Sequence, residues 1–413
     1  MLCLLWVSLA VQSVFAGAEP KDDPADLTVW PNQTSRANSD AWLAENHDQI
    51  RQMRPRLLVL NFSREQPLPK LKHLVNEIMA AVKEGSRYHG YTNPAAPAFL
   101  DYQLFKFIDL RDNSKEKGNS PTLPLKPGVT NGYNIDHIRF FSEEFAKYYE
   151  VKDAKEPGRF LRLDELIDHG YVHEVWIILE TTPEAVAYEC VELKPQYGAD
   201  FTRVPGKFVQ AGNGGDPEQK WTGRSVRLGF INPTRGPGCF MESLSHSIEG
   251  TADSGAIPYF TKYFHEFAGH DLKARFGLPF DTFYALWGAT NGVAYPNPTT
   301  AIITWKGKTN LVENYLAYGG NVHYPPNGRR DYDLENTDPV LSTIEDWRIG
   351  SGPGGQDVPV LWKNERFAQY RKLAPDCMGP WLVYWRQNFP GLDNRQKDDA
   401  GKPIKNWWPF LFY

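Results

Sequence analysis

The residues best suited to chemistry lie in one stretch, VRLGFINPTRGPGCFMESLSHSIEG at positions 226–250. Glu242, His246 and Glu249 follow each other at i, i+4 and i+7, so on a helix of 3.6 residues per turn they share one face. A catalytic zinc ion needs about three imidazole or carboxylate ligands and an open position for water. His323 is the predicted third ligand, because flanking glycines and prolines in GGNVHYPPN would hold its imidazole in a fixed direction.

Two interpretations of this helix remain open. In the first, the ligands of Zn²⁺ are His246, Glu249 and His323. Glu242 then acts as the general base, and Arg235, in the loop before the helix, orients an anionic end of the substrate. In the second, the two glutamates form the solvated face of an amphipathic helix and His246 bonds to one of them. The spacing alone does not decide between the two.

An acidic segment further along the chain suits a different cation. Asp331, Asp333 and Glu335 alternate with other residues, and hard oxygen ligands at this spacing suit Ca²⁺. The segment is not an EF-hand, because Asn336 and Ser342 stand where that loop needs glycine and glutamate. The segment is therefore predicted to be either a looser calcium site or a solvated acidic loop.

The motif HEFAGH at 265–270 looks like a zinc-protease helix but does not have its spacing. On a continuous helix His265 and His270 would be about 140° apart, whereas the zinc motif places its histidines four residues apart on one face. Only Glu266 and His270 would share a face. These residues are predicted to lie on a helix surface.

Composition narrows the class of protein. The chain has 413 residues, of which 41% are hydrophobic and 23% charged, so it can fill a core. A net charge of −5 and the lack of a basic stripe argue against nucleic-acid binding. The many aromatic residues suit sugar-stacking sites, and they suit a bulky core at least as well.

The first 16 residues, MLCLLWVSLAVQSVFA, predict a signal peptide cleaved before Gly17. The protein would then be secreted or periplasmic, with no stable membrane span after cleavage; an uncleaved anchor is the alternative. Cys190, Cys239 and Cys377 would remain. They permit at most one internal disulfide, and the sequence does not say which cysteines form it.

Strand and helix patterns alternate through the first 250 residues. The predicted strands are Arg56–Phe62, Tyr102–Leu110, Glu174–Leu179 and Val226–Ile231. The predicted helices are Pro69–Glu84, Asp136–Tyr149, Leu163–His169 and Cys239–Glu249. This order predicts an α/β fold, a mainly parallel sheet with helices on both faces, followed by a loop-rich C-terminal part.

The predicted organisation has four segments: a signal peptide at 1–16, a polar leader at 17–45, a sheet domain at 46–250 and the C-terminal part at 251–413. One continuous domain is the alternative for the last two. In the C-terminal part, Pro258–Arg275 and Trp381–Asn388 are predicted helices, and the apolar end Trp407–Tyr413 is expected to dock on the body.

The pairing of ExxxHxxE at 242–249 with GNVHxPPN at 320–327 resembles secreted bacterial proteins of uncharacterised function, and the resemblance implies no activity. The first hypothesis is a secreted metal-dependent hydrolase acting on peptide or amide bonds. The alternatives are a glycan-active or glycan-binding extracellular protein and a non-catalytic envelope protein. The partner would be a small-molecule, peptide or glycan substrate, and the sequence does not predict the oligomeric state.

Overall fold

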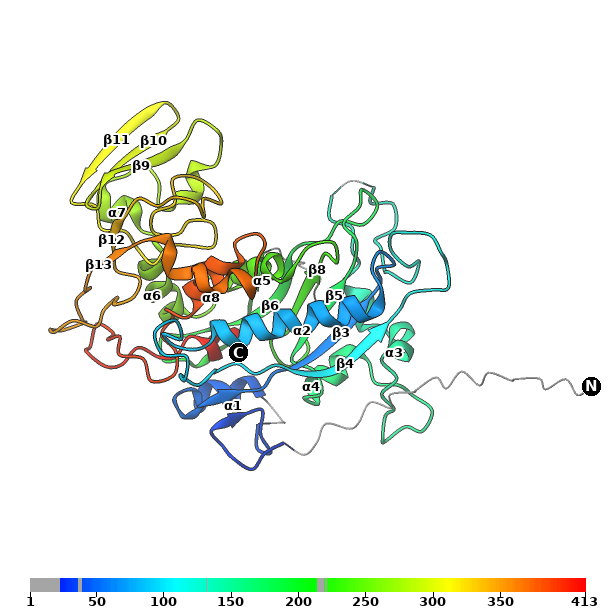
Figure 1. Ribbon diagram of the computed structural model, residues 1–413. Helices are drawn as coiled ribbons and strands as arrows, with labels where there is room; N and C mark the ends of the chain where they lie inside the picture. Colours follow the sequence, from blue (N-terminus) through cyan, green and yellow to red (C-terminus); the bar gives the residue numbers. More distant parts are fainter. Residues whose placement is uncertain (1–22, 36–38, 131, 214–218, 220) are drawn as a thin grey trace, which may run out of the picture.

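The computed structural model describes residues 23–413 except 36–38, 131, 214–218 and 220. The predicted signal peptide lies outside the described residues. A six-stranded sheet with the order β4-β3-β5-β8-β6-β7 forms the centre of the molecule (Figure 1). Its strands are β3 (Arg56–Asn61), β4 (Gln103–Asp109), β5 (Glu174–Ile178), β6 (Cys190–Tyr197), β7 (Arg203–Ala211) and β8 (Arg227–Ile231).

The prediction of a mainly parallel sheet is wrong. Strands β4, β3, β5 and β8 are parallel, but β6 runs antiparallel to β8 and β7 antiparallel to β6. The smaller sheets add antiparallel pairs, β9 (Gly292–Asn297) and β11 (Lys308–Glu313) with β10 (Thr300–Trp305), and β12 (Val340–Ser342) with β13 (Val360–Trp362). Antiparallel contacts therefore make up five of the nine strand pairings among the described residues.

The strand pair β6–β7 escaped prediction because its sequence looks unlike a buried strand. Pro195 sits within β6, but β6 pairs with β8 only over Cys190–Glu192, so the missing N–H of the proline falls where one edge is free. Lys194 is fully buried and lies 3.4 Å from the Glu192 carboxylate and 3.4 Å from the Ser225 hydroxyl. Buried charges of this kind are compatible with a strand only when they are paired.

Helices cover both faces of the central sheet, and residues of β3 alternate between them. Leu57 and Val59 join the core beneath α2 (Leu68–Gly85) and α5 (Pro237–Asp253). Leu58 and Leu60 join the opposite core, beneath α3 (Glu143–Tyr149) and α4 (Leu163–Asp168). The helix α8 (Gly379–Arg386) returns from the C-terminal part to pack on α5 and α2 (Figure 1).

Several predicted elements end earlier than their apolar pattern. The predicted helix 136–149 is divided into η2 (Ile138–Phe141) and α3 at Ser142, whose hydroxyl accepts a hydrogen bond from Phe145 N. The predicted helix 258–275 stops as α6 (Pro258–Ala268), because Gly269 adopts a left-handed φ of 75°, and α7 (Leu272–Phe276) follows. In the C-terminal part, predicted to be rich in loops, residues 292–297 form strand β9.

The segment predicted as a polar leader contributes to the body. Trp30, in β1 (Val29–Trp30), is 1% exposed, and β1 pairs with β2 (Gln52–Met53). Helix α1 (Ser39–Glu45) and η1 (His47–Gln49) follow β1. The docking predicted for Trp407–Tyr413, which includes η5 (Trp408–Leu411), is confirmed, since each of these residues is buried. The remaining elements are η3 (Phe283–Leu286) and η4 (Asn364–Lys372).

His47 fastens the C-terminal segment to the start of the body. Its Nδ1 lies 2.7 Å from the hydroxyl of Tyr413 and its Nε2 lies 2.8 Å from the carbonyl of Asn406. Burial, with the nearby Lys405 ammonium, lowers the pKa of His47 to about 3 despite the opposing charge of Asp48. The folded protein therefore holds this ring neutral under conditions in which an unfolded histidine, with a pKa of about 6.5, is protonated.

This difference makes stability depend on pH. Because the folded pKa is depressed, the contribution of His47 is complete above about pH 6.5 and is lost as the pH falls toward 3. We expect the melting temperature of His47→Gln to lie below that of the wild type at pH 7, and the gap to narrow at pH 4. His73→Gln, at an exposed position of α2, is the control. A gap that stays constant with pH would contradict this role.

Candidate functional site

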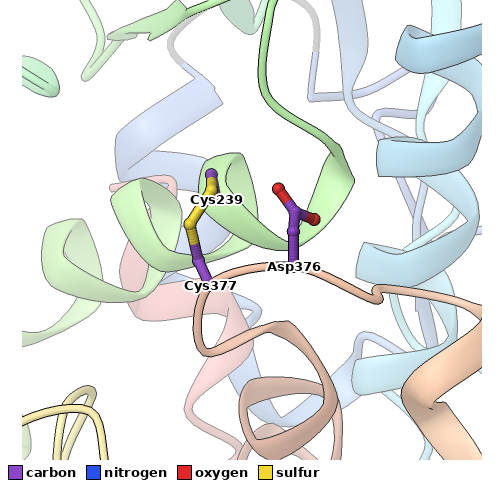
Figure 2. Close-up of side chains that lie close together, drawn as sticks. All are labelled: Cys239, Asp376 and Cys377. Carbon is purple, nitrogen blue, oxygen red and sulfur yellow. A yellow bond between two sulfur atoms is a disulfide. The ribbon is translucent and has the colours of Figure 1, made fainter.

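A carboxylate from a distant part of the same chain caps the N-terminus of α5. The Asp376 carboxylate accepts hydrogen bonds from the backbone N–H groups of Gly236 (2.7 Å) and Gly238 (2.8 Å). Cys377, the next residue, forms a disulfide with Cys239 (Figure 2). Free N–H groups and the helix dipole make such an end attractive to anions. Here an internal carboxylate satisfies that attraction, so this end is not free to bind a substrate anion.

Further along the same helix, Glu242 and His246 meet His323 from the loop between β11 and β12. The two Nε2 atoms of His246 and His323 are 2.8 Å apart, and His323 Nε2 is 3.5 Å from Glu242 Oε1. One ligand atom from each residue lies within 4.8 Å of the other two, an arrangement that could hold a metal ion. The structure thus brings the two predicted histidines together.

A carboxylate stands behind each imidazole. His246 Nδ1 lies 3.0 Å from Glu249 Oε2, and His323 Nδ1 lies 2.8 Å from Asp331 Oδ1. Carboxylates in this position fix the ring orientation and tautomer of histidine ligands in metal sites. The structure therefore places Glu249, predicted as a metal ligand, on the side of His246 that faces away from His323.

Glu249 has both oxygens engaged. Its Oε1 accepts the backbone N–H of Val322 at 3.0 Å, and its Oε2 accepts the Tyr284 hydroxyl at 2.8 Å. Through these bonds one side chain connects α5, the residue before His323 and η3. Its position indicates that Glu249 orients the site, while Glu242 provides the carboxylate beside the two free nitrogens.

Without a cation, the contact between the two neutral imidazole rings is unfavourable, because neither Nε2 atom carries a proton. A carboxylate only accepts hydrogen bonds, so the Nδ1 atoms of His246 and His323 carry the protons of the neutral rings. Both Nε2 atoms then present lone pairs, 2.8 Å apart, with the Glu242 carboxylate beside them. Three converging acceptors require a shared proton or a metal ion between them.

The distances fit a small divalent cation after a modest adjustment. Zn–N bonds of about 2.0–2.1 Å place two ligands of a tetrahedral site about 3.3 Å apart. The spacing from His323 Nε2 to Glu242 Oε1 is 3.5 Å, close to this value. The two imidazole nitrogens, at 2.8 Å, would have to separate by about 0.5 Å.

The electrostatic environment of the site is negative. Burial favours the neutral carboxyl, but hydrogen bonds from His323, when its Nε2 carries the shared proton, and from Tyr332 bring the pKa of Glu242 below its ordinary value. Burial opposes protonation of His246 as well, yet the hydrogen bond to Glu249 and surrounding carboxylates raise its pKa. Both shifts have the sign expected where acidic groups favour a bound cation.

Tyr332 closes one side of this cluster and was not foreseen from the sequence. Its hydroxyl donates to Glu242 Oε1, and its ring centroid is 4.4 Å from that of His323. Its backbone has a left-handed φ of 59°, an uncommon conformation for a side chain of this size. The other oxygen of Glu242, Oε2, is buried and has no hydrogen-bond partner.

A pocket lies at the carboxyl ends of β5 and β8, where α5 begins, and its lining does not include Glu242, His246 or His323. Arg235 lines it, and the guanidinium donates to Cys377 Sγ at 3.0 Å rather than reaching the histidines. Ser243, next in sequence to Glu242, lies on its wall, and the charge of Glu189 at its rim acts on His246. The remaining lining residues are Leu179, Thr181, Ala187, Tyr188, Phe230, Ile231, Asn232, Gly236, Cys239 and Phe240.

The acidic segment predicted to bind Ca²⁺ divides its side chains among different partners. Asp331 contacts His323, Asp333 accepts from Arg329 at 2.6 Å, and Glu335 lies 3.5 Å from Arg371. Among the described residues, these three acids do not form one of the groups that could hold a metal ion. The structure thus connects the segment to the histidine cluster through its first acid.

Two further groups of the described chain have metal-ligating side chains close together. Cys239, Asp376 and Cys377 form one, but both sulfurs are used in the disulfide, as Figure 2 shows. Asp253, His265 and His270 form the other. The third cysteine, Cys190, is a buried free thiol.

Comparison of the chain with protein-family models, with curated proteins and with solved structures found no match. The candidate site is therefore described from its own geometry. Within the described part of the chain, every helix is too short or too polar to cross a membrane.

The cap on α5 can be tested by mutation. Asp376→Ala removes the acceptors of two helix N–H groups, and we expect it to lower the free energy of unfolding by about 1–2 kcal/mol in chemical denaturation. Asp376→Asn retains one acceptor oxygen and should cost less. If both variants unfold at the same denaturant concentration as the wild type, the carboxylate is not a stabilising cap.

Proposed function

We propose that this protein is a secreted metal-dependent hydrolase, with a divalent metal, Zn²⁺, bound by His246, His323 and Glu242. The observation that carries the proposal is the convergence of three acceptor atoms with no protein donor between the imidazole nitrogens. Carboxylates behind both rings, from Glu249 and Asp331, match the surroundings of histidine ligands in metal sites.

Hydrolysis is the chemistry that suits this ligand set. Two histidines and one glutamate with an open position are a zinc hydrolase arrangement, and zinc bound there would lower the pKa of a water molecule and polarise a carbonyl. The neighbouring pocket offers apolar walls and a cationic rim at Arg235, which would orient an anionic end of a peptide or amide substrate.

A polar group beside the cluster would assist the reaction. Because Glu242 is a metal ligand in this proposal, it no longer has the general-base role that the sequence predicted for it. The Tyr332 hydroxyl, now bonded to the same carboxylate, is placed to donate to an oxyanion that develops on the substrate. Glu249 and Asp331 hold the two rings during this exchange.

Metal content tests the proposal directly. After dialysis against trace Zn²⁺, His246→Ala and His323→Ala should each contain one zinc ion per chain fewer than the wild type, measured by elemental analysis. The control is His73→Ala, because this histidine is exposed on α2 and belongs to none of the groups of ligands found among the described residues. Equal zinc content in the two site variants and the wild type would refute the metal site.

Tyr332→Phe separates catalysis from metal binding. It keeps the ring against His323 but removes the hydroxyl, so zinc content should stay at the wild-type level. Loss of one oxyanion donor typically costs about 10²–10³ in kcat. Release of products from a mixture of peptides and N-acyl amino acid amides, followed by mass spectrometry, should slow accordingly. An unchanged rate would exclude this hydroxyl from the reaction.

A further inference from the structure

A second group of ligands lies at the other end of α5. Asp253, the last residue of that helix, meets His265 from α6 and His270 from the turn after it. The Asp253 Oδ1 atom is 2.7 Å from His265 Nε2 and 3.2 Å from His270 Nδ1. One acidic and two imidazole side chains from three successive elements thus converge on one point.

The end of a helix creates this group. His265 and His270 would point about 140° apart on a continuous helix, but α6 ends between them. Gly269 takes the left-handed φ of 75°, and a Cβ there would lie 2.8 Å from the Tyr318 ring. The chain turns back so that the N–H of His270 donates to His265 O at 2.9 Å, and the two ring centroids are 5.3 Å apart.

We propose that Asp253, His265 and His270 form a second cation site, for a divalent transition metal such as Zn²⁺, independent of the proposed hydrolase centre. Metal–ligand bonds of about 2.0–2.2 Å place adjacent ligands about 2.8–3.1 Å apart in octahedral sites and about 3.3–3.6 Å apart in tetrahedral sites. The two observed distances, 2.7 and 3.2 Å, are close to these ranges. Two histidines and one carboxylate leave positions for water.

Exposure and charge support a site that solvent can reach. The His270 side chain is 7% exposed and fixes the base, whereas His265 and Asp253 are 35% and 49% exposed and leave an open side. Carboxylates around His270, including Glu249, Asp253 and Asp271, make this corner of the fold negatively charged, which favours a cation.

The two groups cannot share one binuclear centre. His246 and Asp253 are seven residues apart on α5, which is about 10 Å along the helix axis, whereas metal ions in two-metal sites are about 3.5–4 Å apart. The second ion would instead tie the end of α5 to α6 and the turn before α7. We therefore expect it to stabilise this corner of the fold without taking part in hydrolysis.

The test is a Zn²⁺ titration of chelator-treated protein by calorimetry, with Asp253→Asn, His265→Gln, His246→Ala and the control His73→Ala. The wild type and the control should bind two ions per chain, and each of the other variants one. The rise in melting temperature on adding Zn²⁺ should persist in His246→Ala. It should be smaller in the double mutant that combines His246→Ala with Asp253→Asn. Circular dichroism of each variant verifies folding, which we expect because His265 and Asp253 are partly exposed.

The stoichiometry distinguishes this proposal from the hydrolase proposal. One ion per wild-type chain, lost in His246→Ala and retained in Asp253→Asn, would overturn the second site and leave the first intact. If the wild type binds one ion, and that ion is lost in Asp253→Asn and retained in His246→Ala, the first site alone would be overturned. Two ions in Asp253→Asn and in His265→Gln would show that these side chains hold no metal.

Discussion

The carboxylate of Glu249 is the group on which the arrangement of the histidine cluster depends. It bonds to the ring of His246, to the backbone before His323 and to the hydroxyl of Tyr284. Glycine residues free the backbone of the His323 loop, so an isolated loop would sample many directions. A buried charged acceptor with three donors restricts that freedom, because leaving any one donor unpaired costs about 1–3 kcal/mol.

The facing imidazoles follow from this restraint. Because Glu249 and Asp331 accept hydrogen bonds from the Nδ1 atoms, the Nε2 atoms of two neutral rings meet as acceptors, and without a shared proton or a cation their repulsion is an energy that the fold must offset elsewhere. Extensive burial can offset it: the core between α5, α6 and α8 contains many fully buried aromatic rings, among them Trp381, Trp385 and Phe264. A site strained in this way gains stability when a cation enters, since the repulsion becomes coordination.

Much of the local structure could be predicted from the sequence, but the relations between distant segments could not. Apolar runs located β3, β4, β5 and β8, and the spacing of Glu242 and His246 placed both on one helix face. The roles of Glu242 and Glu249 depend on which nitrogen of His246 each carboxylate faces, and ring orientation is set by tertiary contacts. The antiparallel strands β6 and β7 were hidden by Pro195 and by buried charges, of which Glu192 pairs with Lys194 on its own strand and with Arg227 on β8.

The convergence of His265 and His270 shows the same limit at short range. Helical periodicity correctly separates residues five apart, but only while the helix continues. Gly269, in the left-handed conformation, ends the helix between the two histidines, so their side chains converge instead of pointing apart. The acidic segment after His323 is comparable. Its alternating carboxylates suggested one shared cation, but Asp333 pairs with Arg329, four residues before it, and Glu335 pairs with Arg371, which is distant in sequence.

The disulfide between Cys239 and Cys377 spans 138 residues and closes a large covalent ring. That ring contains the His323 loop and the sheet β9–β11, while the helix that carries Glu242 and His246 begins at its first cysteine. A protease that nicks the chain inside the ring, for instance at the exposed glycine-rich turn 351–353, therefore leaves two fragments that still migrate as one species. They separate only when a thiol reductant is present, so cleavage at this turn need not release the C-terminal fragment that carries Cys377 and α8.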